Sequence, residues 1–132
     1  MSMLTKAEIL GANDLKTQVV ECPEWGGSVT IRSLTAAQVQ AHGRSLFTKE
    51  VTTNGMGGKS STQYVVDPDK VTRSDARLVS MSIVDDSGVL VFTEADVELL
   101  MAKSAAPIKR IALAQAILSG ITEKAVEESE KN

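Results

Sequence analysis

Aromatic residues are scarce in this chain of 132 residues, which has one Trp, one Tyr and two Phe. A domain of this length buries roughly two thirds of the surface of its unfolded chain, so its core must be mainly aliphatic. The single cysteine excludes an internal disulfide and is typical of a reducing compartment. The sequence also lacks a membrane-spanning apolar run and the apolar stretch of a signal peptide. Together with a net charge of −3, these absences predict a soluble cytoplasmic protein without nucleic-acid or membrane partners.

The N-terminal quarter of the sequence predicts a short helix followed by a β-hairpin. Thr5-Lys6-Ala7-Glu8 has the pattern of a capping box, and the helix that it opens should end near Gly11. Residues 16–22 and 28–33 have the alternating apolar pattern of strands, and Pro23-Glu24-Trp25-Gly26-Gly27 predicts the reversal between them. An isolated hairpin is marginal in water, so we expect it to pack against another element.

The rest of the sequence predicts mostly helices separated by turns. Capping patterns predict helices over 35–50, over 68–84 with Asp69, Arg73 and Arg77 on its solvent side, and from 93 onward. Residues 89–92 predict a short apolar strand or an extended segment. Residues 52–66 are rich in Gly, Ser and Thr and predict a flexible loop, and residues 122–132 predict an acidic helix or tail. We therefore expect one α+β domain over residues 1–132, mostly helical, with a small N-terminal antiparallel hairpin sheet.

The most apolar helix is predicted over residues 104–119, and it carries apolar side chains on two faces. A helix that is apolar nearly all round lies in the centre of a core or binds another molecule. Trp25, at the tip of the hairpin, can have one of two roles. Either it packs against the body of the domain and clamps the hairpin there, which we favour, or it is an exposed residue that contacts a partner. The candidate partner-binding residues are Trp25 and five residues of this helix. Ile108, Ile111 and Leu118 lie on one of its faces, and Leu113 and Ile117 lie on the other.

No group of residues has the pattern of a catalytic, cofactor or metal site. Gly57-Gly58-Lys59-Ser60 has the end of a phosphate-binding loop but lacks the earlier Gly, the strand and the helix that this motif needs. His42 has no second ligand at a zinc spacing, and Cys22 has no histidine near it in the sequence. The sequence therefore predicts binding rather than catalysis, with no enzymatic activity and no cofactor.

Six segments, in this order along the chain, carry the pattern of a known family. They are Leu4-Thr5-Lys6, Val20-Glu21-Cys22-Pro23-Glu24-Trp25-Gly26-Gly27, Ile31-Arg32-Ser33-Leu34-Thr35, Val84-Asp85-Asp86-Ser87-Gly88, Phe92-Thr93-Glu94-Ala95-Asp96-Val97 and Lys103-Ser104. In these segments the chain resembles the tail assembly chaperones of long-tailed (siphovirus-type) bacteriophages and prophages with non-contractile tails. The Gly-rich stretch over 54–61 departs from that pattern.

The resemblance implies an assembly factor in the cytoplasm of the bacterial host that is absent from the mature virion. Such a chaperone binds the tape-measure protein, keeps it soluble and helps tail-tube subunits to polymerise around it. We also expect contact with the tail-tube protein, self-association, and a longer product made by translational frameshifting, for which Glu130-Lys131-Asn132 can be encoded by an adenine-rich slippery run. The alternative is a structural minor tail or head–tail component of the virion.

Overall fold

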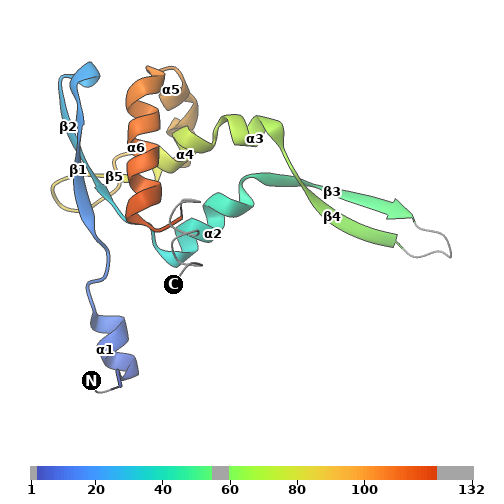
Figure 1. The fold of residues 1–132 in the computed structure, drawn as a ribbon, viewed down its shortest axis with the longest axis horizontal. Helices are drawn as coiled ribbons and strands as arrows, with labels where there is room; N and C mark the ends of the chain where they lie inside the picture. The colour runs from blue at the N-terminus through green and yellow to red at the C-terminus, as the bar shows by residue number, and fades with distance from the viewer. Residues whose placement is uncertain (1–2, 55–59, 122–132) are drawn as a thin grey trace, which may run out of the picture.

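A small antiparallel sheet forms one side of the molecule in the computed structural model (Figure 1). The structure describes residues 3–54 and 60–121, and for 47–54 and 60–66 it describes the backbone alone. The strand order of the sheet is β1-β2-β5. The bounds are β1 (Thr17–Cys22), β2 (Gly27–Arg32) and β5 (Ile83–Val84), and the 3₁₀ turn η1 (Pro23–Trp25) joins β1 to β2. Gly26 follows η1 with a φ of 80°, a conformation that favours glycine. The predicted hairpin and α+β class are confirmed.

The core lies between this sheet and the longest helix. α6 packs against β1 and β2 on one side and against α4 on the other (Figure 1). The helices are α1 (Lys6–Gly11), α2 (Ala36–Arg44), α3 (Pro68–Thr72), α4 (Ser74–Ser80), η2 (Glu94–Asp96), α5 (Val97–Met101) and α6 (Ala105–Leu118). The buried core is aliphatic, as the scarcity of aromatics predicts, and Trp25 and Phe92 pack only against its edge.

Side-chain caps begin several helices where the sequence predicts them. The hydroxyl of Thr5 accepts a hydrogen bond from the Glu8 amide at 3.2 Å, and the hydroxyl of Thr35 accepts one from the Gln38 amide at 3.2 Å. In both cases the acidic or amide side chain also accepts a hydrogen bond from the amide of the cap residue, which completes the capping box. At α3, the carboxylate of Asp67 accepts a hydrogen bond from the Asp69 amide at 2.9 Å.

Two predicted helices are shorter than expected. The helix predicted over 35–50 ends at Arg44, and β3 follows it. The helix predicted over 68–84 is broken at Arg73 into α3 and α4, and it ends at Ser80, before β5. Over residues 89–92, for which the sequence predicts a short strand or an extended segment, the structure has an isolated β-bridge between Leu90 and Val84.

The prediction of a flexible loop over 52–66 is wrong for the residues of that segment that the structure describes, because they form strands. β3 (Phe47–Asn54) and β4 (Ser60–Val66) form an antiparallel hairpin that extends away from the sheet and α6 (Figure 1). The prediction gave weight to Gly and Ser, whereas the strands contain the β-branched and aromatic residues that favour extended backbone. Residues 55–59, which include most of the phosphate-loop-like motif, and residues 122–132, where the acidic tail is predicted, lie outside the described residues.

One fully buried polar side chain joins α6 to β2 and to the turn between α4 and β5. The Gln115 side-chain amide donates hydrogen bonds to the Arg32 carbonyl at 2.6 Å and to the Ser82 hydroxyl at 2.9 Å. Its oxygen accepts a hydrogen bond from the Ser119 hydroxyl at 2.6 Å, and that hydroxyl in turn accepts one from the Leu34 amide at 2.9 Å. Every polar atom of this side chain is therefore satisfied.

We expect Gln115→Met to lower the free energy of unfolding by about 1–3 kcal/mol, because it keeps the buried volume but removes the donors and the acceptor from their partners. Urea denaturation at neutral pH measures this difference. Lys109→Met, on the exposed side of the same helix, is the matched control and should change stability by less than about 0.5 kcal/mol. Equal effects of the two variants would contradict the central role of Gln115.

Candidate partner-binding site

α6 presents one face to the core and another away from it. Ile108 and Ile111 are buried, and Leu118 is half-buried and packs against the same core. Because residues three or four apart share a helix face, this set forms the inner side of α6. These three candidates are therefore core residues, and Ile111 has no exposed surface.

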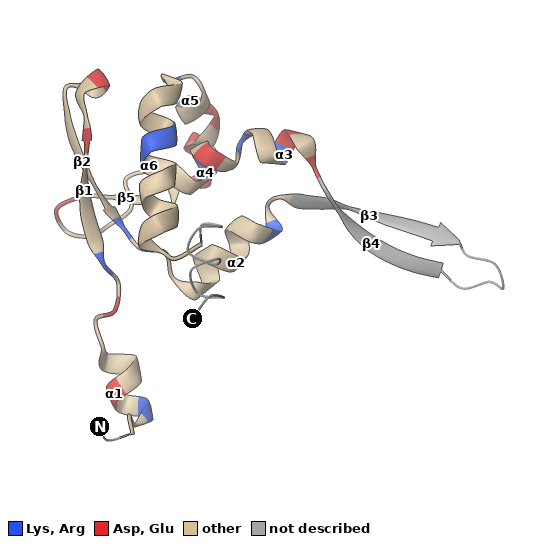
Figure 2. Ribbon diagram, viewed as in Figure 1, with Lys and Arg blue, Asp and Glu red and all other residues tan. Residues whose placement is uncertain are grey.

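The opposite face of α6 carries a short apolar stripe. Leu113 and Ile117 are one turn apart, and 59% and 62% of their surfaces are exposed. Lys109 lies one turn before Leu113 and is also exposed. Figure 2 shows this basic turn on an otherwise uncharged helix. We call Lys109, Leu113 and Ile117 the outer stripe, and its geometry confirms that the two apolar faces predicted from the sequence are distinct.

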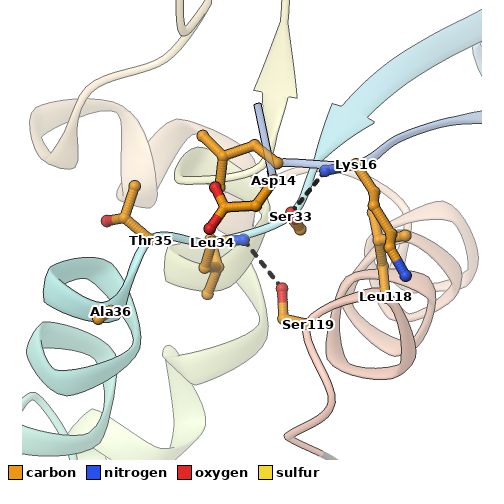
Figure 3. Close-up of a pocket in the computed structure, with 9 residues that line it drawn as sticks. Asp14, Lys16, Ser33, Leu34, Thr35, Ala36, Leu118 and Ser119 are labelled. Carbon is orange, nitrogen blue, oxygen red and sulfur yellow. Dashed lines mark hydrogen bonds between the residues drawn. The ribbon is translucent and has the colours of Figure 1, made fainter. Parts of the chain in front are cut away.

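A pocket of about 400 Å³ lies at the C-terminal end of α6 (Figure 3). The Ser33 hydroxyl in its wall accepts a hydrogen bond from the Lys16 amide at 2.9 Å, and Ser119 accepts the one from Leu34. Both hydroxyls thus hold the backbone of the segments that flank β1 and β2. The residues that line the pocket do not bring together an acid, a base and a nucleophile.

An ion pair between Glu24 and Arg110 joins the tip of the β1–β2 hairpin, which carries Trp25, to α6. Both terminal nitrogens of Arg110 donate to the Glu24 carboxylate, at 2.9 and 2.8 Å, and one of them also donates to the Glu21 carbonyl at 3.3 Å. Trp25 is half-buried and packs against the core. The packing of Trp25 against the core agrees with the role that we favour for this residue, a clamp of the hairpin onto the domain.

The same ion pair determines the acidity of Glu24. The forked hydrogen bonds from Arg110 lower the pKa of the Glu24 carboxyl to about 2. Close by, Cys22 is fully buried, and burial raises the pKa of its thiol. Cys22 thus has the environment of a buried apolar side chain rather than that of a nucleophile.

The contribution of the ion pair between Glu24 and Arg110 to stability should decrease in acid. A carboxyl whose pKa is lowered in the folded state stabilises the fold above its unfolded pKa of about 4.3, and this contribution is lost as the pH falls toward about 2. Glu24→Gln should therefore be less stable than the parent at neutral pH, and the difference should shrink as the pH is lowered through this range. Urea midpoints measured at several pH values test this. Glu21→Gln is the control, because the carboxylate that it replaces forms no hydrogen bond or ion pair with the described residues.

Other residues with reactive or charged side chains are placed as follows. His42 is half-buried in α2, and within 3–54 and 60–121 no three potential metal ligands lie together. No helix in this part of the chain is long and apolar enough to cross a membrane. Arg77 was predicted on the solvent side of one long helix, which is wrong: the break at Arg73 changes the phase of α4, and the Arg77 side chain is only 15% exposed.

Comparison with known proteins gives two matches. A family model described as phage tail assembly chaperone matches residues 6–132. Among solved structures, the tail assembly chaperone of bacteriophage HK97 is similar to this chain, with a TM-score of 0.55 and 14% sequence identity over 83% of this chain and 88% of that chain. At this identity the structural likeness shows a shared fold. No curated protein matches the sequence.

Proposed function

We propose that this chain, which belongs to the phage tail assembly chaperone family, binds the tape-measure protein, keeps it soluble and promotes polymerisation of the tail tube around it. The family is named for a chaperone role, which requires binding surfaces rather than a reaction centre. In this proposal the protein acts in the cytoplasm of the bacterial host, contacts the tail-tube protein during polymerisation, and is absent from the finished virion.

The observation that supports client binding is the outer stripe of α6. A long helical client exposes apolar side chains at helical spacing, and such side chains pack against an apolar surface with the same spacing. Leu113 and Ile117 offer that spacing on a helix whose other face is anchored in the core. Lys109, one turn away, can pair with an acidic side chain at the edge of the contact.

Co-expression with the tape-measure protein tests this proposal. Leu113→Lys combined with Ile117→Lys should leave the fold intact, because both residues are exposed, but the tape-measure protein should no longer co-purify and should become insoluble. Leu99→Lys, at an equally exposed leucine of α5, is the matched control and should retain the client. Ile111→Lys should instead unfold the chain, because it places a charge in the core.

Two results would contradict the proposal. If the double variant is folded by circular dichroism and still keeps the client soluble, the outer stripe is not the binding surface. If the chain is present in purified virions in stoichiometric amounts, the structural minor tail or head–tail component is the better assignment. The frameshifted product stays a prediction, which the nucleotide sequence over Glu130-Lys131-Asn132 tests.

Self-association is the second part of the proposal, and α1 supports it. This helix has no buried residue and lies apart from the sheet and α6 (Figure 1). Leu4, Ile9 and Leu10 expose most of their surfaces there. A helix of two turns does not persist on its own in water, so it needs a surface to pack against. We infer that a second copy of the chain provides that surface.

Light scattering coupled to gel filtration tests the role of α1. The intact chain should have a mass above the 14.0 kDa of one copy. Leu4→Lys combined with Leu10→Lys should reduce the mass to that of a monomer that is still folded by circular dichroism, because neither side chain contributes to the core. Leu99→Lys is again the control. An intact chain that is monomeric at high concentration, or a variant that stays oligomeric, would show that α1 does not mediate association.

A further inference from the structure

A second site follows from one arginine whose side chain is buried without a hydrogen-bond acceptor. α4 places Arg77 so that its Nε and one terminal nitrogen are buried and have no acceptor in the described part of the chain. The Glu94 carboxylate lies 3.8 Å from Nε, which is too far for a hydrogen bond, and the Glu94 side chain is 85% exposed. A buried guanidinium is normally hydrogen-bonded to its counter-ion, and the ion pair with Glu94 provides no hydrogen bond to these buried nitrogens.

Arg77 lines a cavity of about 340 Å³ between α2, α4 and the segment over residues 90–94, which we call the Arg77 pocket. Met81, Leu90 and Phe92 contribute apolar walls. Its volume lies in the range of pockets that hold a small molecule or a group of side chains. The cavity therefore combines apolar packing surface with one cation.

The hydroxyls in the pocket wall already have hydrogen-bond acceptors. The Ser45 hydroxyl donates to the His42 carbonyl at 2.6 Å, and the Ser80 hydroxyl donates to the Arg77 carbonyl at 2.6 Å. The hydroxyl of Thr93 donates to the Asp96 carboxylate at 3.3 Å. Among the described residues, the buried nitrogens of Arg77 thus still lack a hydrogen-bond acceptor.

The charged groups around the pocket are Arg77 in its wall, Glu94 at its rim and Asp75 on α4. Burial, and to a lesser degree the charge of Arg77, lowers the pKa of His42. Its Nδ1 is also buried without a partner. Asp75 acts on His42 from α4, and Glu94 is largely in solvent. An incoming carboxylate would therefore meet the guanidinium in a partly desolvated site, where a forked ion pair is strong.

We propose that the Arg77 pocket binds an acidic side chain of the protein client, an Asp or Glu whose neighbouring aliphatic side chain packs against Met81, Leu90 and Phe92. The protein nature of this partner rests on the proposed function, whereas the carboxylate chemistry rests on the pocket itself. The Arg77 pocket shares no residue with the outer stripe of α6, so it provides a second, charge-selective point of contact.

A titration with a small carboxylate tests the chemistry independently of any client. The probe is 4-methylpentanoate, which has the carboxylate and branched alkyl end of an acidic and an aliphatic side chain, and 4-methylpentanamide is its uncharged control. We expect the acid to shift the NMR resonances of the Arg77 Nε–H and the Met81 methyl saturably, with a dissociation constant on the order of millimolar. The amide should not produce these shifts. Equal shifts with both compounds, or none with either, would overturn the carboxylate site.

A pair of arginine variants tests the role in client binding. Arg77→Met keeps the aliphatic bulk but removes the donors, and it should weaken the complex with the tape-measure protein about 10- to 100-fold. Arg73→Met is the matched control, because Arg73 is half-buried at the neighbouring helix start and already pairs with Glu98 at 2.5 Å; it should bind the client as the parent does. If Arg77→Met fails to fold, Arg77→Lys, which keeps the charge and loses the fork, should show the same loss to a smaller degree.

The outcomes separate the two proposals. Unchanged client affinity in both Arg77 variants would overturn the pocket as a client site and leave the outer stripe in place. A parent chain that binds no tape-measure protein would overturn the proposed function, and the titration with the small acid would then decide whether the pocket selects carboxylates.

Discussion

The orientation of α6 depends on the hydrogen bonds of one buried side chain. Gln115 can satisfy its amide in this core only by pointing at the Arg32 carbonyl and Ser82 while accepting from Ser119. Residues along a helix are separated by about 100°, so a side chain two positions before or after Gln115 points to the opposite side. Leu113 and Ile117 are those two positions. The contact that stabilises the core therefore also keeps the outer stripe exposed.

Local signals in the sequence were sufficient for much of the fold. The capping boxes at Thr5 and Thr35 and the turn around Gly26 act over a few residues, so they are visible without tertiary context. The sequence failed where neighbouring elements decide the outcome. β5 is two residues long and exists because β2 offers it an edge, and β3 and β4 pair with each other in a segment whose composition favours a loop.

The candidate site was predictable in part for the same reason. Helical periodicity separates Ile108, Ile111 and Leu118 from Leu113 and Ile117, but it does not say which set faces the core; only packing between the sheet and α4 determines this. Arg77 was missed because its burial follows from a helix break at Arg73. That break has a weak signal in the sequence, since Thr72, Arg73 and Ser74 include neither Gly nor Pro.

A chaperone for an apolar client must expose apolar groups without aggregating. This chain distributes them over separate elements: among the described residues, the exposed large apolar side chains lie at α1, on β1, α3, α5 and α6, and in the segment over 89–91. Small separate patches do not drive strong association by themselves, whereas a long client that touches several of them at once gains from each contact. Selectivity then requires a contact that apolar side chains cannot supply, and the Arg77 guanidinium, buried in an apolar pocket, has the chemistry for it.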